Sequence, residues 1–267
     1  MPTTLASLTV YPIKSARGMP VAEWEVDDFG LRNDRRFMVV NQSGEFLTQR
    51  LHPRLALVTP HVEGGRLRVN APGMPELDLP LQPEPTVVTQ VTIWNDACAA
   101  TWLGETAAQW FSEVLGRSCS LVHMHAQTRR PTNPVYDKTG ARVSFADAFP
   151  FLIISEASLA DLNRRLADPL PMNRFRPNLT VSGGDPYQED GWTRIRIGRL
   201  PLNVVKPCAR CVITTTDQAT TERGVEPLRT LATYRNIGGQ VMFGQNAVHE
   251  SGGSLRIGDR VVVVQHR

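Results

Sequence analysis

The sequence predicts a mainly β protein with a few helices, of the α+β class, organised in two domains. The chain has 267 residues, enough to bury one large core or two smaller ones. Its 20 glycines and 20 prolines favour a fold with many turns, and 41% of its residues are hydrophobic, as is typical of folded proteins. Short β-branched segments bounded by turn residues recur along the chain. We expect a first domain over residues 1–121 and a second over residues 122–267.

Strand candidates follow one another in the first half. Leu5–Lys14 alternates apolar and polar residues, is rich in β-branched side chains, and runs into a loop. Four further candidates, whose spacing predicts a closed or sandwiched β domain, are Arg36–Asn41, Leu55–Thr59, Arg66–Asn70 and Thr86–Trp94. The segment Gly104–Leu115 places apolar residues at helical spacing and predicts one amphipathic helix. We expect its aromatic residues, Trp110 and Phe111, to belong to the core.

The second half begins with a polar, proline-containing segment between Ala126 and Ala141, which predicts an interdomain or active-site loop. The segment FPFLIISEASLADLNRRL then predicts a strand that runs into a helix, with Ser155 as the N-cap. The apolar stripe of this helix consists of Leu159, Leu162 and Leu166. The remaining expected elements are mainly strands: Thr193–Ile197, Leu202–Val205, the run VITTTD after Cys211, and a terminal hairpin over Val248–Val264.

Charge and hydropathy indicate which partners and compartments to expect. The formal net charge is only +3 and the basic residues are dispersed, so we expect neither a nucleic acid nor a membrane surface as partner. The N-terminal segment lacks the pattern of a signal peptide, and no apolar run is long enough to span a membrane. These features predict a cytoplasmic protein with reduced cysteines.

Two of the four cysteines, Cys208 and Cys211, lie together in the segment KPCARCVITTT. A structural zinc site commonly needs two such pairs, or one pair with two histidines. The other two cysteines are widely separated, and the nearby histidine pair is His123 and His125. A thioredoxin-like dithiol needs the motif at the start of a helix, whereas a strand-like run follows Cys211. Both interpretations therefore have little support.

Two other interpretations of the pair stay open. One is a single soft thiolate that binds a transition metal, with the cations Lys206 and Arg210 helping to keep it deprotonated. The other is two ordinary buried cysteines in a β-barrel. The spacing alone does not decide between them.

Short basic segments point to an anionic ligand. Lys14, Ser15 and Arg17 lie in the loop after the first predicted strand, where side chains and free backbone N–H groups could hold a phosphate. The planar guanidinium of arginine suits phosphate or a flat heterocycle, and the candidates are Arg35 and Arg36 of NDRRF and Arg174 and Arg176 of NRFRPN, which ends in Asn178. Taken singly, each arginine is more typical of a surface salt bridge. Dinucleotide-binding, P-loop, serine-hydrolase and zinc-protease motifs do not occur.

Seven segments in order resemble a known family: YPIKSARG, GLRNDRRFMVV, SFADAFPFLIISEASLADLN, NRFRPNLTVSG, KPCARCVITTTD, EPLRTL and FGQN. The chain resembles the MOSC superfamily, in the branch that carries a MOSC N-terminal β-barrel domain. That branch includes the mitochondrial amidoxime-reducing component and bacterial homologues that reduce N-hydroxylated compounds. The resemblance covers nearly the whole chain. It implies a MOSC β-barrel packed against an N-terminal β-barrel-like domain.

The resemblance also implies a cofactor and the residues that bind it. The family binds molybdenum cofactor (Mo-molybdopterin), and Cys211 stands where the family has the thiolate ligand of molybdenum, whereas Cys208 stands where the branch often has a cysteine that is not the ligand. The side chains implied in cofactor binding are those of Lys14, Ser15, Arg36, Arg176 and Asn178. The main chain around Ala148, Phe149, Ala209, Arg210 and Asn246 would complete the pocket, although related members often have small hydroxylic residues at the positions of Ala148 and Phe149.

The function implied is the reduction of N-hydroxylated small molecules such as hydroxylamines, amidoximes or N-hydroxylated bases, with Cys211 as the catalytic residue. Some bacterial members carry a C-terminal iron–sulfur domain, whereas this chain ends at Arg267. We therefore expect electrons to come from external electron-transfer proteins, such as a flavin or iron–sulfur reductase. The alternative is a module that binds the cofactor or carries sulfur as a persulfide, without redox turnover of its own.

Overall fold

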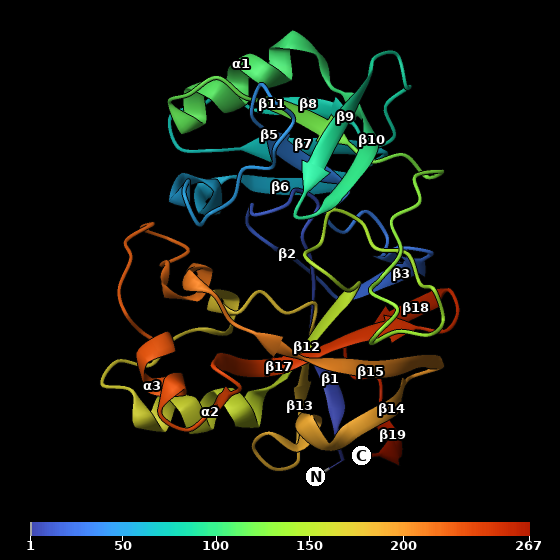
Figure 1. Ribbon diagram of the computed structural model, residues 1–267, viewed down its shortest axis with the longest axis vertical. Coiled ribbons are helices and arrows are strands. Elements are labelled where there is room, and N and C mark those ends of the chain that lie inside the picture. Colours follow the sequence, from blue (N-terminus) through green and yellow to red (C-terminus); the bar gives the residue numbers. More distant parts are fainter. Residues whose placement is uncertain (1) are drawn as a thin grey trace.

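Two lobes make up the computed structural model, which describes residues 2–267 (Figure 1). We call them the upper lobe, which contains residues 37–123 and parts of the loops beside them, and the lower lobe, which contains most of the remaining chain. Strands dominate both lobes and three α-helices accompany them. The predicted α+β class with mainly β structure is confirmed.

The upper lobe contains two antiparallel sheets and one helix. One sheet has the strand order β5-β11-β10-β9 and the other the order β6-β7-β8. Helix α1 (Gly104–Leu115) has the predicted bounds and buries Trp110 and Phe111 in the core of this lobe, as expected. The strands are β5 (Phe37–Val40), β6 (Thr59–Glu63), β7 (Arg66–Asn70), β8 (Leu77–Pro80), β9 (Val88–Ile93), β10 (Asp96–Trp102) and β11 (Ser120–His123).

The lower lobe is built on a nine-stranded sheet. Its order is β19-β14-β15-β17-β12-β13-β1-β2, and β16 pairs with β17. These strands are β1 (Thr4–Val10), β2 (Met19–Val21), β12 (Phe151–Ser155), β13 (Leu179–Ser182), β14 (Trp192–Ile197), β15 (Leu200–Ala209), β16 (Asn236–Ile237), β17 (Gln240–His249) and β19 (Val261–His266). A three-stranded sheet adjoins it, with the order β18-β3-β4: β3 (Glu23–Asp27), β4 (Gly30–Leu31) and β18 (Gly253–Arg256).

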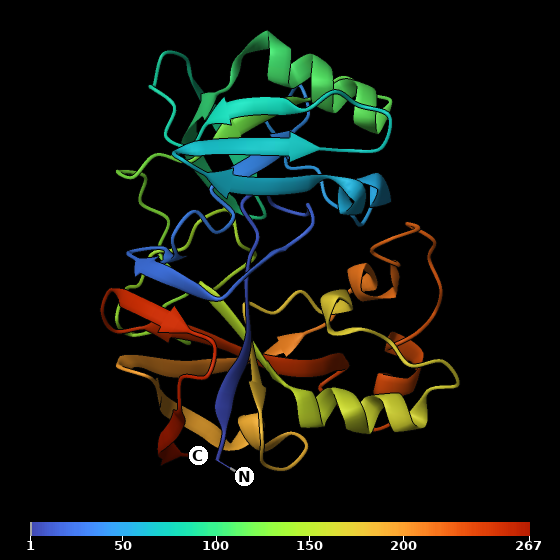
Figure 2. The same cartoon turned by 180° about the vertical axis from the view of Figure 1, so that it is seen from behind.

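Strand β1 belongs to the lower lobe although it begins the chain. It pairs antiparallel with β13, and Leu5 and Leu8 lie in the same hydrophobic core as Phe151 and Trp192. Figure 2 shows β1 rising from the N-terminal end, beside the C-terminal end, toward the upper lobe. The chain therefore starts in the lower lobe, crosses to the upper one, and returns. The division between residues 121 and 122 stays a prediction.

Helix α2 (Glu156–Arg165) follows strand β12 directly, as predicted. The Ser155 hydroxyl oxygen accepts a hydrogen bond from the Ser158 backbone N–H at 3.0 Å and so caps the helix. Of the predicted stripe, Leu162 is fully buried, and Leu159 and Leu166 pack partly buried against the same cluster. The third helix, α3 (Leu228–Ala232), and the 3-10 turns η2 (Met172–Arg174) and η3 (Gln188–Gly191) complete this side of the lobe.

Two predicted strands are wrong. Residues 53–57 form the 3-10 turn η1 (Pro53–Leu57), and strand β6 begins only at Thr59. Proline at the start of η1 fixes a helical φ and cannot donate to a sheet, which explains the outcome. The run after Cys211 forms the 3-10 turn η4 (Val212–Thr215), in which the Thr214 and Thr215 hydroxyls donate to backbone carbonyls of the turn.

The predicted terminal hairpin is also wrong. Strand β18 pairs with β3 and strand β19 pairs with β14, so the two strands lie in different sheets. Both segments do form strands, but each pairs with a strand that is distant in sequence. Pattern alone does not identify a partner strand.

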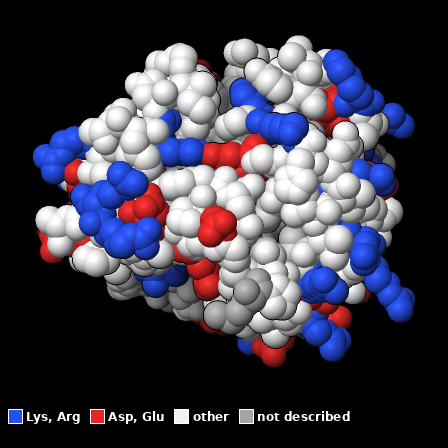
Figure 3. All heavy atoms as spheres, turned by 90° about the horizontal axis from the view of Figure 1, so that it is seen from below, with Lys and Arg blue, Asp and Glu red and all other residues white. Residues whose placement is uncertain are grey.

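The segment between β11 and β12 contains the loop predicted between Ala126 and Ala141, which has no helix or strand of its own. No helix within residues 2–267 combines the length and apolar character needed to cross a bilayer. On the face shown in Figure 3, basic and acidic side chains lie interspersed.

Candidate functional site

A cavity of about 280 Å³ gathers nearly all of the predicted site residues. They come from the loop after β1, the loop before β12, the approach to β13, the end of β15 and the middle of β17. The predicted residues that line the cavity are Lys14, Ser15, Ala148, Phe149, Arg176, Asn178, Ala209, Arg210, Cys211 and Asn246. Arg36 does not line it.

Irregularities in strand β15 carry the cysteine motif to the cavity. Its pairing with β17 shifts register between Val204 and Lys206 and again between Pro207 and Ala209. Such bulges re-aim side chains and occur often beside functional sites. In β17, Gly244 has φ +81°, and a Cβ there would lie 2.9 Å from the Ile153 carbonyl oxygen, so glycine is required for the close strand contact. These features place Lys206–Cys211 beside Asn246.

The two motif cysteines have different surroundings. Arg210 donates from Nη1 to Cys208 Sγ at 3.0 Å and from Nη2 to the Phe175 carbonyl oxygen at 2.6 Å. Cys211 has extended backbone and directly precedes η4. Both cysteines are free thiols that line the cavity. Arg210 therefore links the Cys208 sulfur to the main chain at Phe175.

The other two cysteines lie in the upper lobe. Cys98 and Cys119 are buried in separate hydrophobic clusters there, and burial raises the pKa of both thiols. Within residues 2–267 no group of three or more His, Cys, Asp and Glu side chains is arranged to hold a metal ion.

Two arginines stack on one tyrosine at the cavity wall. The guanidinium carbons of Arg35 and Arg176 lie 4.2 and 4.4 Å from the ring centre of Tyr11, whose hydroxyl donates to the Pro177 carbonyl oxygen at 3.1 Å. Burial lowers the pKa of Arg176 to about 10, and the neighbouring Tyr11 opposes this shift. The guanidinium therefore stays charged at neutral pH.

A buried polar network fixes Arg35. It donates from Nη1 to Asp34 Oδ2 at 2.6 Å and to Asn178 Oδ1 at 2.9 Å, and Asn178 donates in turn to Asp34 Oδ1 at 3.1 Å. The network joins the loop before β5 to the approach to β13. Asn178 therefore orients Arg35 as well as lining the cavity.

Arg36, which the resemblance implied in cofactor binding, lies outside the lining of the cavity. Its Nη2 and Nε donate to the Met124 carbonyl oxygen at 2.5 and 3.2 Å, and its guanidinium lies 4.2 Å from the ring centre of Phe29. Arg35 lines the cavity instead. The sequence named both arginines, but only the loop conformation decides which one faces the cavity.

Lys14 and Asp147 form an ion pair at the cavity wall. The Lys14 ammonium donates to Asp147 Oδ1 at 2.5 Å and to the Phe145 carbonyl oxygen at 2.7 Å. Burial lowers the pKa of Lys14 to about 8. Partial burial raises the pKa of Asp147, but the Lys14 and Arg50 charges and hydrogen bonds outweigh this effect and hold it below its usual range.

Comparison with known proteins identifies the family. Residues 2–118 match the MOSC N-terminal beta barrel domain, and residues 140–262 match the MOSC domain. The chain belongs to the MOSC family. The resemblance drawn from the seven sequence segments is therefore confirmed.

Curated relatives of this MOSC protein extend over nearly its whole length. It is 38% identical to mitochondrial amidoxime-reducing component 1 of Homo sapiens over 98% of this chain and 83% of that protein. It is 36% identical to mitochondrial amidoxime reducing component 2 of Rattus norvegicus over 97% of this chain and 82% of that protein. It is 33% identical to molybdenum cofactor sulfurase of Solanum lycopersicum over 97% of this chain but 35% of that protein.

The positive charge of the MOSC cavity suits a cofactor that carries negative charge, and its cysteine sulfur suits the metal ion of that cofactor. Asp147 is the one carboxylate among the lining residues, against six cations: Lys14, Arg35, Arg50, Arg176, Lys206 and Arg210. The buried Nε of Arg210 has no hydrogen-bond partner within residues 2–267 and is free to donate to a ligand. The Cys211 thiol adds the soft donor that a transition metal needs.

Three residues that line this MOSC cavity have a strained backbone conformation. Ser15, Arg35 and Arg176 have φ of 67°, 48° and 57°, in the left-handed region that side chains rarely adopt. All three line the cavity. Strain of this kind clusters at binding sites, where the surrounding structure holds it in place.

Several lining residues were missed or not assigned to the site from the sequence. Arg50 lies in none of the motif segments, Asp147 lies in the segment SFADAFPFLIISEASLADLN but was not named as a site residue, and Lys206 was expected only to assist a thiolate. The position of Asp147 directly before Ala148 was the available signal. Arg50 offered none, because it follows a stretch without periodic pattern.

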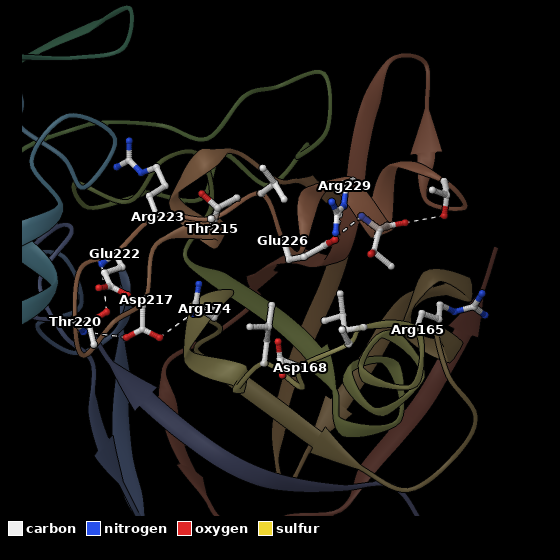
Figure 4. A pocket seen from close by; sticks show the side chains of 17 residues that line it. Arg165, Asp168, Arg174, Thr215, Asp217, Thr220, Glu222, Arg223, Glu226 and Arg229 are labelled. Atoms are coloured by element: carbon white, nitrogen blue, oxygen red, sulfur yellow. Dashed lines mark hydrogen bonds and ion pairs between the residues drawn. The ribbon is translucent and has the colours of Figure 1, made fainter.

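A larger hollow of about 920 Å³ lies near η4 and helices α2 and α3 of this MOSC protein (Figure 4). Its charges are largely paired: Arg174 donates to Asp217 at 2.9 Å and Arg229 to Glu226 at 2.7 Å. Four arginines face four carboxylates around it, so it lacks the charge excess of the smaller cavity. None of the residues predicted to bind the cofactor lines it.

The depressed pKa of Lys14 predicts a pH dependence of stability. Its pKa is about 8 in the folded protein and 10.5 for an unperturbed lysine, so the unfolded chain binds more protons between these values. The free energy of unfolding of the cofactor-free protein should therefore gain up to about 3 kcal/mol from this residue as pH rises through that window. Urea titrations of wild type and Lys14→Met measure the difference.

In Lys14→Met the free energy of unfolding should no longer rise in this way between about pH 8 and pH 10.5. The exposed Lys138 provides the matched control, because Lys138→Met should keep the wild-type pH dependence. A rise of equal size in Lys14→Met would show that Lys14 is not the titrating group.

Proposed function

We propose that this MOSC protein is a molybdenum-cofactor-dependent reductase of N-hydroxylated small molecules. The observation that carries the proposal is the cavity in which Cys211 is surrounded by cationic side chains. Its curated relatives are named amidoxime-reducing components and molybdenum cofactor sulfurase, which supports both the reaction class and the cofactor.

The chain's own residues would bind the cofactor in three ways. The Cys211 thiolate is the proposed ligand of molybdenum, because sulfur is the softest donor in the cavity and the other lining cysteine, Cys208, already accepts a hydrogen bond from Arg210. Arg35 and Arg176, held in place by Tyr11, would donate to the phosphate or the pterin. Backbone groups near Ala148 and Asn246 would complete the cradle. When bound, this cofactor supplies the two-electron chemistry that converts an N–OH group to N–H and water.

Electrons would come from separate redox proteins, which we propose to be a flavin or iron–sulfur reductase. The word "component" in the names of the relatives supports a system of several proteins. Those relatives are also named mitochondrial. The cytoplasmic location expected for this chain stays a prediction.

The second candidate function is that of a sulfur carrier. The similarity to molybdenum cofactor sulfurase and the presence of both Cys208 and Cys211 in the cavity favour it. In that case one cysteine thiolate would take the outer sulfur atom of a donor protein's persulfide, releasing the donor's thiolate, and no bound molybdenum would be needed. The surplus of positive charge around the cavity favours the reductase, because a persulfide alone does not require six cations.

The test uses protein produced in a host that synthesises the cofactor. We expect about one molybdenum per chain, as for a site with one thiolate ligand. With a chemical reductant such as reduced methyl viologen, the protein should convert benzamidoxime to benzamidine, whereas NADH alone should give no turnover. Stoichiometric zinc without molybdenum, or a persulfide without metal, would contradict the proposal, and turnover with NADH alone would contradict the need for external redox proteins.

A further inference from the structure

Two exposed aromatic side chains contact residues that line the cavity without lining it themselves. Trp94 is 46% exposed and Tyr136 is 42% exposed. Trp94 comes from the upper lobe and Tyr136 from the segment between β11 and β12. Neither residue has a role in the proposed binding of the cofactor.

Trp94 has a backbone conformation that its residue type disfavours. It is the first residue of the two-residue turn that joins β9 to β10, in which Ile93 pairs with Asp96. Its φ is 54°, and hairpin turns with a positive φ at this position favour glycine, asparagine or aspartate. A bulky side chain there is an outlier, and such outliers cluster where the side chain has a functional use.

The contacts of Trp94 lead directly to the cavity. Its Nε1–H donates to Asp147 Oδ1 at 3.3 Å, and the Arg50 guanidinium lies 4.6 Å from its ring centre. Both Asp147 and Arg50 line the cavity. Figure 1 shows the β9–β10 turn pointing from the upper lobe toward the lower lobe.

Tyr136 has a matching set of contacts. Its ring meets that of Phe149 edge to face, with centroids 6.4 Å apart, and the Lys206 ammonium lies 4.3 Å from its ring centre. Phe149 and Lys206 also line the cavity. Each exposed ring is thus held by one cation and a second lining residue, and nearly half of its surface stays open to solvent.

We infer that Trp94 and Tyr136 form an aromatic entrance to the cavity that selects N-hydroxylated substrates carrying a flat aromatic or heteroaromatic ring. The inference rests on the proposed reductase function. A flat substituent stacks on an exposed aromatic ring, while the N–OH group attached to it extends into the polar cavity. A small aliphatic substrate has no surface with which to make this contact. The entrance therefore determines specificity and takes no part in the chemical step.

The first experiment compares kcat/KM for benzamidoxime and acetamidoxime, with a chemical reductant. Trp94→Gly and Tyr136→Ala should each lower the benzamidoxime-to-acetamidoxime ratio by about tenfold, the effect of losing one aromatic pair. Trp94→Phe keeps a ring but loses the hydrogen bond to Asp147, so it should keep most of the ratio. Trp94→Gly relieves the backbone strain but loses the contacts of the ring with Asp147, Arg50 and Phe46, so its thermal unfolding is recorded to establish that the variant is folded.

The matched control is Ile237→Ala, which truncates an exposed apolar residue of β16 that does not line the cavity, and it should leave the ratio unchanged. A second readout needs no turnover: titration calorimetry of cofactor-loaded protein with benzamidoxime, without reductant. Trp94→Gly and Tyr136→Ala should each weaken this binding about tenfold.

The two readouts separate the inference from the function on which it rests. If neither amidoxime is reduced by wild type, the proposed function fails, and calorimetry still tests the entrance. If both variants keep the wild-type ratio or the wild-type affinity for benzamidoxime, the aromatic entrance is overturned.

Discussion

Replacing Cys211 by serine should abolish the reduction of N-hydroxylated substrates. Loss of a residue that only orients a metal ligand commonly costs about 10- to 100-fold, so loss of the ligand itself should cost at least about 100-fold. Serine keeps the shape, but its hydroxyl is a harder and much less acidic donor than a thiol. The measurements are the rate of benzamidoxime reduction and the molybdenum content of the purified variant.

Cys208 provides the control within the same motif. Its sulfur accepts a hydrogen bond from Arg210 at 3.0 Å, and a serine hydroxyl can accept the same bond. Cys208→Ser should therefore keep its activity within about fivefold of wild type, the cost of weakening one hydrogen bond. Equal losses in both variants would mean that the cysteines act as a pair, as in a zinc clip or a redox disulfide.

Removing the Arg176 guanidinium should lower cofactor occupancy without unfolding the protein. Its nitrogen atoms make no hydrogen bond to the protein that the structure records within residues 2–267, and its main contact is the face of Tyr11. All N–H donors of the Arg176 guanidinium would therefore be available to the phosphate or the pterin of the cofactor. Loss of a charge-assisted hydrogen bond costs about 1.5–3 kcal/mol, so Arg176→Gln should weaken cofactor binding by about 10- to 100-fold.

Arg36→Gln is the matched control, since it makes the same substitution in an arginine whose donors bond to the Met124 carbonyl oxygen. We expect wild-type molybdenum content, with a loss of about 1–3 kcal/mol in the free energy of unfolding. Metal analysis and urea denaturation of both variants separate the two effects. Full occupancy in Arg176→Gln, or loss of molybdenum in a folded Arg36→Gln, would reverse the assignment made from the structure.

Local patterns in the sequence were sufficient for helices α1 and α2 and for several strands, such as β1, β7 and β12, whereas helix α3 and strands such as β3, β10 and β11 were not predicted. Helix α1 was predicted with its observed bounds, because its apolar residues repeat at helical spacing. Helix α2 was predicted by the cap at Ser155. The errors occurred where local and tertiary preferences differ. The β-branched run after Cys211 forms a 3-10 turn because threonine hydroxyls bond to its own carbonyls.

Most site residues were also predicted, but through resemblance in ordered motifs and not through periodicity. Lys14, Arg176, Cys211 and Asn246 do meet in one cavity. Asp147, Arg50 and the aromatic residues at the entrance were not predicted. They lie in turns and loops, where residue type carries little information about direction.

The sequence by itself determined the fold class and the family, because hydrophobic pattern and motif order can be read directly from the chain. Through the family resemblance alone it implied Cys211 as the proposed metal ligand. Only the tertiary structure decided that β1 pairs with β13, that β18 and β19 lie in different sheets, and that Arg35 rather than Arg36 lines the cavity. Strand partners are selected by packing between segments far apart in sequence. The direction of an arginine in a loop depends on the loop conformation and on distant partners, here the φ of 48° at Arg35 and the hydrogen bonds of its guanidinium to Asp34 and Asn178. Neither quantity leaves a pattern in the order of the residues.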